Sequence, residues 1–159
     1  MGRITLKIKV ENLEDILRAE RGQLAPEQVR SVQVDALVDT GATLLCLPAN
    51  AIAGLGLSLL STRKITTANG PVEIRLFRGA RLTIFNRTCT VDVMELQNGV
   101  PALIGYVPLE VLDLTLDLKR HAVVPNPEHG DEIVLDLFPC MACHEGGFAP
   151  ALAGAERRL

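Results

Sequence analysis

The sequence predicts an all-β domain, folded as a closed barrel or a sandwich of short strands with one or two short helices. Apolar side chains recur at every second position in several segments, which is the period of a half-buried strand. Turn residues separate these segments at short intervals. The chain has 159 residues with an apolar content of 48%, which suffices for the core of one domain.

The first strands and helix follow directly from this pattern. Residues 4–10 and 32–38 alternate between apolar and other side chains, so each segment predicts a strand with one buried face. Between them, Asn12 can cap a helix over residues 13–21. Glycine and proline then predict a loop over residues 22–26.

A hairpin is the clearest feature of the middle of the chain. The Asn-Gly dipeptide at residues 69–70 is the strongest short hairpin signal, and it separates predicted strands over 62–68 and 71–78. The other predicted elements are, in chain order, a strand over 44–47, a helix over 50–55, strands over 81–85, 88–96, 114–118 and 122–124, and, as an open alternative, a strand over 133–138.

An acidic turn interrupts one of the apolar segments. Asp39, Thr40 and Gly41 come straight after the apolar residues 36–38, and an apolar strand resumes over 44–47. A carboxylate at such a buried-looking turn is costly unless the protein uses it. Gly41 permits a sharp turn that a side chain would resist. The turn is therefore a candidate active-site loop.

A second apolar segment, which ends in Gly105, completes a familiar order of motifs. The Asp39 turn, the hairpin and this segment resemble, in that order, the retropepsin-like (retroviral-type) aspartic proteases, and among them the single-domain cellular relatives. The resemblance is best over residues 29–120. It implies a protease domain over residues 1–125, with a closed barrel and a short helix over 108–112, and a partly loose C-terminal extension over 126–159.

The resemblance implies roles for the matched residues. Asp39 is the catalytic acid, and the residues supporting its loop are Thr40, Gly41 and Ala42. The tip of a flap that closes over the substrate comprises Ala68, Asn69 and Gly70. The segment that passes under the catalytic loop comprises Leu103, Ile104 and Gly105. The retroviral enzymes pair an acid after the catalytic loop with an arginine after the second glycine, but Thr43 and Tyr106 occupy these positions here.

The Asp-Thr-Gly motif occurs once, and its chemistry needs two carboxylates around one water. A second subunit related by a two-fold axis is the simplest source of the other carboxylate, and the family uses this arrangement. We therefore expect a homodimeric aspartic endopeptidase that acts on a polypeptide substrate without a cofactor or metal. The alternative is a dimeric binding or scaffold module of the same fold that does not cleave peptides.

Composition excludes other classes of partner. The net charge of −3 and the scarcity of aromatic residues argue against a nucleic-acid-binding surface. No segment approaches the roughly 20 apolar residues of a membrane span. The N-terminal residues 4–10 read as a strand and not as a signal peptide, so we expect a cytoplasmic protein.

Four cysteines raise one further alternative. Cys46 and Cys89 lie in apolar strand-like segments and read as small core residues. Cys140, Cys143 and His144 formally match a haem attachment pattern, and a metal site could include them. Two cysteines and one histidine are too few for a structural zinc site, so we interpret this segment as a tail without a ligand.

Overall fold

Alternating apolar residues begin the fold, as expected. In the computed structural model, which describes residues 3–67, 70–130 and 132–134, strand β1 (Thr5–Asn12) pairs antiparallel with β2 (Ser31–Val38). Ile8 faces Val34 across this pair, and both Ile8 and Val10 are buried. The alternation predicted for residues 4–10 and 32–38 is confirmed, because the apolar positions share one face that packs into the core.

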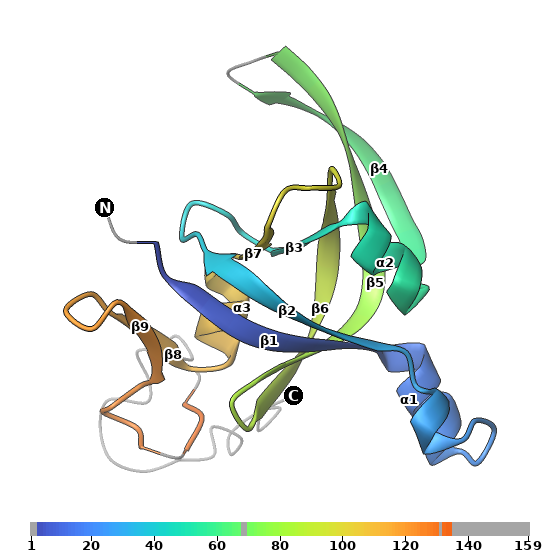
Figure 1. Cartoon of the computed structure of the whole chain (residues 1–159), viewed down its shortest axis with the longest axis horizontal. Coiled ribbons are helices and arrows are strands. Elements are labelled where there is room, and N and C mark those ends of the chain that lie inside the picture. The colour runs from blue at the N-terminus through green and yellow to red at the C-terminus, as the bar shows by residue number, and fades with distance from the viewer. Residues whose placement is uncertain (1–2, 68–69, 131, 135–159) are drawn as a thin grey trace, which may run out of the picture.

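Six strands close into a barrel, which confirms the predicted fold class. The seven-stranded sheet has the order β1-β2-β7-β3-β6-β5-β4, and an additional pairing of β1 with β5 closes the ring. Strand β4 pairs only with β5 within this sheet, so it lies outside the ring. Figure 1 shows β4 and β5 rising together beyond the barrel.

Apart from η1, which the sequence does not predict, and β5, the remaining helices and strands agree with the sequence in type and differ in their bounds. They are α1 (Leu13–Glu20), the 3-10 helix η1 (Pro26–Gln28), β3 (Leu45–Pro48), α2 (Ala49–Leu55), β4 (Ser58–Thr67), β5 (Gly70–Ile84), β6 (Arg87–Leu96), β7 (Ala102–Ile104), α3 (Tyr106–Val111), β8 (Leu114–Asp117) and β9 (Ala122–Pro125). The 3-10 helix η1 begins at Pro26, the last residue of the predicted loop, and α3 begins two residues before the expected helix.

One prediction about the strands is wrong. The sequence predicts two strands over residues 71–78 and 81–85, but residues 71–84 belong to the single long strand β5, and Phe85 lies in the turn after it. Gly79 has a positive φ of 80°, and the pairing register between β5 and β6 shifts between Phe77 and Ala80. This bulge bends the strand without ending it. Before the bulge β5 pairs with β4, and after it β5 pairs with β1, so the bulge lets one strand serve both partners.

The core fills the barrel and draws on most of its strands. Its most buried side chains include Ile8, Leu45, Leu82, Val93 and Ile104, which are at most 1% exposed. They come from five different strands, so no local segment could form this core alone.

Helix α1 is held against the barrel by polar side chains at its first turn. The Asn12 Oδ1 accepts from the Asp15 N–H, which confirms the predicted cap, and Asn12 Nδ2 donates to Leu55 O at 2.9 Å. The Arg30 guanidinium donates to both Asp15 carboxylate oxygens at 2.6 and 2.8 Å. These bonds from Arg30 lower the pKa of Asp15. Arg30, in the segment before β2, is therefore bonded to the first turn of α1.

A buried arginine anchors the segment that follows β9. Arg87 donates to the backbone carbonyl oxygens of Leu112, Asp113, Gly130 and Glu132 at 2.8–3.1 Å. Its guanidinium lies 3.7 Å from an Asp113 carboxylate oxygen.

Asp113 is itself held by several partners. Burial raises the pKa of its carboxyl group, but the hydrogen bonds from His129, Asn126 and the Val134 N–H, together with the charge of His129, leave that pKa below its ordinary value. The predicted strand over 133–138 is not formed at Ile133 and Val134, and residues 135–138 lie outside the described part of the chain.

Within the described ranges, no helix combines the length and apolarity needed to cross a bilayer.

Arg87→Leu should lower the free energy of unfolding by about 3 kcal/mol, because two buried and two partly buried hydrogen bonds to carbonyl oxygens lose their donor. Urea denaturation followed by circular dichroism measures this loss. The matched control is Arg75→Leu, which removes an exposed ion pair with Glu95 and should cost less than about 1 kcal/mol. Equal losses in the two variants would contradict an anchoring role for Arg87.

Candidate active site

The Asp39 loop connects β2 to β3 at the point where β2 runs parallel to β7. Val38, the last residue of β2, pairs with Ile104 of β7. The Asp39 N–H donates to Ile104 O at 3.0 Å and continues this pairing by one residue. The Ala42 N–H donates back to Asp39 O at 3.0 Å and closes the turn. The loop is therefore fixed at both of its ends by backbone hydrogen bonds.

The Asp39 carboxylate is oriented by its own loop. The Gly41 N–H donates to Asp39 Oδ1 at 2.9 Å, and a Cβ atom at position 41 would lie only 3.1 Å from that oxygen. A side chain there would crowd the carboxylate, which explains the glycine physically. Asp39, Thr40 and Gly41 are all exposed in the single chain. The site thus presents an oriented carboxylate that solvent can reach.

Gly105 passes directly against the other side of this loop. A Cβ atom at position 105 would lie 2.5 Å from Ala42 O, 2.6 Å from the Thr43 carbonyl carbon and 2.7 Å from Leu44 O. These are backbone atoms, which cannot move aside as the end of a side chain can. The Gly105 N–H donates to Leu44 O at 3.1 Å across the same contact. The sequence-based expectation that this segment passes under the Asp39 loop agrees with this geometry.

Backbone hydrogen bonds join the loop to α3. The Tyr106 N–H donates to Ala42 O at 3.0 Å, and the Val107 N–H donates to Thr43 O at 3.3 Å. The first N–H groups of a helix have no partner within the helix, and here the loop carbonyls supply one. Thr43 and Tyr106 cannot form the acid–arginine pair of the retroviral enzymes. Backbone hydrogen bonds join the loop and α3 at these positions instead.

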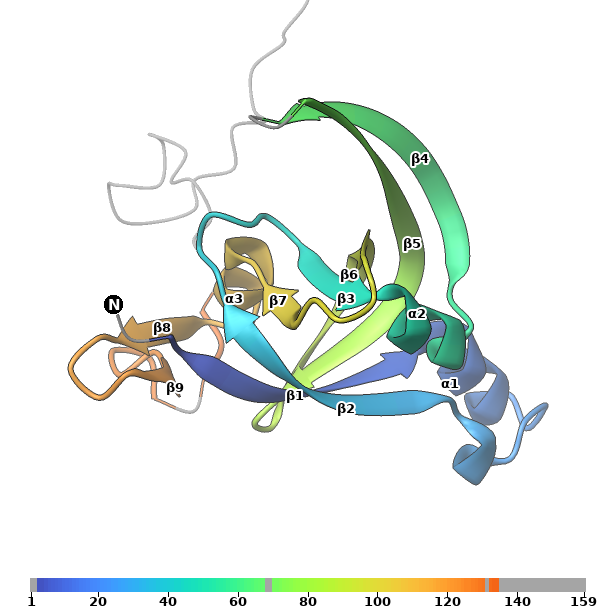
Figure 2. The same cartoon turned by 45° about the horizontal axis from the view of Figure 1, so that its top comes forward.

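The β4–β5 hairpin extends over the same end of the barrel. Figure 2 shows it arching above the β2–β3 connection, and Figure 1 shows both on the same side of the barrel. Thr67 pairs with Gly70 at the end of the described ladder. Ala68 and Asn69, which the sequence assigns to the flap tip with Gly70, lie outside the described residues. The hairpin is therefore confirmed, and the arrangement of its tip stays a prediction.

Sequence reasoning missed one neighbour of Asp39. Cys46 is fully buried, as expected, but it does not belong to the core cluster inside the barrel. Burial raises the pKa of its thiol to about 11, and the negative charge of Asp39 contributes to that rise. Its neighbours in β3, Leu45 and Leu47, do belong to the core. The sequence did contain a signal for this position of Cys46. Side chains alternate along a strand, so Cys46 lies on the face opposite to Leu45 and Leu47.

No metal cluster accompanies the site in the described residues, where no group of three or more His, Cys, Asp or Glu side chains could hold an ion. Cys140, Cys143 and His144 lie outside those residues.

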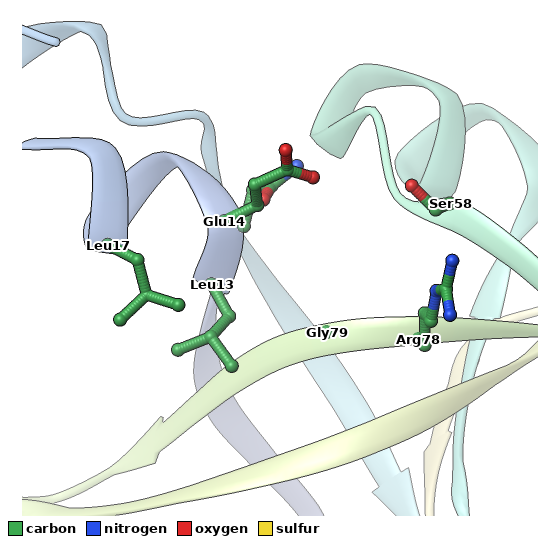
Figure 3. A pocket seen from close by; sticks show the side chains of 7 residues that line it. Leu13, Glu14, Leu17, Ser58, Arg78 and Gly79 are labelled. Carbon is green, nitrogen blue, oxygen red and sulfur yellow. The ribbon is translucent and has the colours of Figure 1, made fainter. Parts of the chain in front are cut away.

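A surface pocket lies at the root of the hairpin, away from the Asp39 loop. Figure 3 shows Leu13, Glu14 and Leu17 of α1 on one side of it, and Ser58 of β4 with Arg78 of β5 on the other. The loop residues do not contribute to its lining. This pocket is therefore separate from the candidate active site.

Comparison with known families adds a finding about this site. A family model described as aspartyl protease matches residues 25–107, a range that contains the Asp39 loop, the hairpin and Gly105. No curated protein matches the chain.

Gly105→Ala should destabilise the protein by about 3 kcal/mol or more, because the new methyl group overlaps backbone atoms of the Asp39 loop. Thermal and urea unfolding measure this loss. Gly54→Ala is the matched control: Gly54 is in α2, with no atom within 4 Å of the new methyl group, and should gain about 0.5–1 kcal/mol. Retention of full stability by Gly105→Ala would show that the loop and β7 are not tightly packed.

Proposed function

This chain belongs to the retropepsin-like aspartyl protease family, and we propose that it is an aspartic endopeptidase whose catalytic residue is Asp39. The observation that carries the proposal is the exposed Asp39 carboxylate, held by the Gly41 N–H on a loop that is fixed against Gly105. The coarser function, that of an aspartyl protease, follows from the family.

The proposed reaction needs a second carboxylate, and we propose that it comes from Asp39 of a second subunit. The sequence has one Asp-Thr-Gly motif, and the single chain leaves Asp39 exposed and without an ion-pair partner among its described residues. Two carboxyl groups a few ångströms apart cannot both ionise cheaply, so they share a proton, as the carboxyl pair of aspartic proteases does. The pKa values of such a coupled pair belong to the pair and not to either residue.

The shared proton defines the roles of the two carboxyl groups. The ionised carboxylate accepts a proton from a water molecule, whose oxygen attacks the carbonyl carbon of the peptide bond. The protonated carboxyl group donates its proton to the carbonyl oxygen as the tetrahedral intermediate forms. Proton transfer to the amide nitrogen then releases the amine, and the C–N bond breaks. The Gly41 N–H keeps the Asp39 carboxylate oriented throughout.

The surrounding residues are assigned supporting roles in this proposal. The Thr40 hydroxyl hydrogen-bonds across the two-fold axis and holds the paired loops, and the Gly41 carbonyl receives the substrate backbone. Ala42 leaves room beside the substrate. The hairpin tip closes over the substrate and excludes water.

Exposed apolar residues on α3 and just after β8 support a dimer. Tyr106 and Val111 of α3 and Leu118 after β8 are 42%, 40% and 71% exposed. The Tyr106 backbone is bonded to the Asp39 loop, so a partner that covers Tyr106 also approaches the catalytic carboxylate. Large exposed apolar groups of this kind mark interaction surfaces when they occur together.

Asp39→Asn should reduce peptide cleavage at least about a hundredfold, because the group that accepts the proton of water is lost. The substitution is nearly isosteric, so the variant should keep its oligomeric state and melt no lower than the wild type at neutral pH. Cleavage of a random peptide library and sedimentation of both proteins measure these effects. A wild type that binds peptides without cleaving any would favour the alternative function as a binding module.

Subunit mixing tests whether the two carboxylates come from two chains. An excess of Asp39→Asn protein added to wild type, with time for subunit exchange, should inhibit cleavage by drawing wild-type chains into heterodimers with one carboxylate. Specific activity should also fall on dilution below the dimer dissociation constant. Activity that is unchanged by both treatments would show that a single chain suffices.

A further inference from the structure

Directly paired residues form a row across five strands beside the catalytic loop. Leu103 of β7 pairs with Cys46 of β3, which pairs with Met94 of β6. Met94 pairs with Leu76 of β5, which pairs with Ser61 of β4. Side chains of directly paired residues project from the same face of a sheet. We call the face that carries this row the Cys46 face.

The Cys46 face is opposite to the barrel core and on the side of Asp39. The next row, which alternates with it, contains Leu45, Val93 and Phe77, and all three belong to the core. The charge of the Asp39 carboxylate reaches Cys46, where it helps to raise the pKa of the thiol. The core face is filled inside the barrel, and the hairpin that carries the Cys46 face arches above the β2–β3 connection (Figure 2), so a substrate bound at Asp39 would meet the Cys46 face and not the core face.

The Cys46 face continues along the hairpin and changes character there. Two residues beyond Leu76 and Ser61 stand Ile74 and Arg63, which pair with each other. Val72 follows on the same face. Near the barrel the face is almost entirely apolar, whereas Arg63 puts an exposed positive charge on the hairpin.

Arg63 differs from Arg75 and Lys64 of the same hairpin, because it has no acidic residue paired with it or directly across the ladder. Arg75 lies on the opposite face, where it pairs with Glu95 at 3.2 Å and covers the ring of Phe77 at 5.1 Å. Lys64, also on the opposite face, stands across from Glu73. Among the residues that the structure describes, Arg63 forms no ion pair.

We propose that Arg63 makes the enzyme select polypeptides that carry an acidic residue a few positions from an apolar cleavage site. The inference rests on the proposed protease function, and it adds the substrate class. An extended peptide under the hairpin would place apolar side chains against the Cys46 face and an acidic side chain against the guanidinium. The chain as a whole has a net charge of −3, so this local positive charge is not part of a generally basic surface.

Binding to the Asp39→Asn protein tests the inference separately from catalysis. Fluorescence anisotropy would measure the affinity for a set of peptides with one apolar centre and a single Glu, Gln or Lys moved through the flanking positions. At one flanking position we expect Glu to bind about fivefold more tightly than Gln, the size of one partly exposed ion pair. This preference should weaken with added salt.

Charge reversal on the two faces of β4 supplies the variant and its matched control. Arg63→Glu should transfer the preference at that position from Glu to Lys, whereas Lys64→Glu, one residue away on the opposite face, should leave it unchanged. Equal affinities for all flanks, no peptide binding, or equal effects of the two reversals would overturn the inference. Cleavage of the same peptides by the wild type tests the proposed function: cleavage without an acidic preference would refute only the role of Arg63.

Discussion

The contact between Gly105 and the Asp39 loop is the constraint on which the site depends. It sets how closely β7 approaches the loop, since a single added carbon would lie 2.5–2.7 Å from three backbone atoms. The same crossing gives the first N–H groups of α3 their acceptors in Ala42 and Thr43. One close approach therefore fixes the loop that carries Asp39, the parallel pairing of β2 with β7 and the start of a helix.

Features encoded by neighbouring residues could be predicted from the sequence. The Asn12 cap, the alternation of β1 and β2 and the turn at Asp39 each depend on residues close together in the chain. The approach of Gly105 to the Asp39 loop could be predicted only from the order of the motifs along the chain. Nothing in the sequence around Gly105 indicates which part of the backbone it must approach. The family match over residues 25–107 agrees with that order.

Long-range pairing explains what the sequence could not predict. The continuity of β5 depends on a change of partner at Gly79, where β4 gives way to β1, and neither partner is close in sequence to both halves of the strand. Arg87 reads as an ordinary charged turn residue until its bonds to the carbonyl oxygens of Asp113, Gly130 and Glu132 are seen. That Cys46 and Arg63 share one face of the sheet likewise follows only from the pairing register of four strands, β3, β6, β5 and β4.

The order in which the chain is synthesised gives the Gly105 crossing a further consequence. A nascent chain that carries Asp39 has no acceptor at Ile104 and no donors at residues 105–107 until that later segment emerges. The barrel also stays open until β5 reaches β1. Because such contacts join distant residues, they form late in folding. The Asp39 loop therefore gains its last hydrogen bonds only after most of the domain has been synthesised.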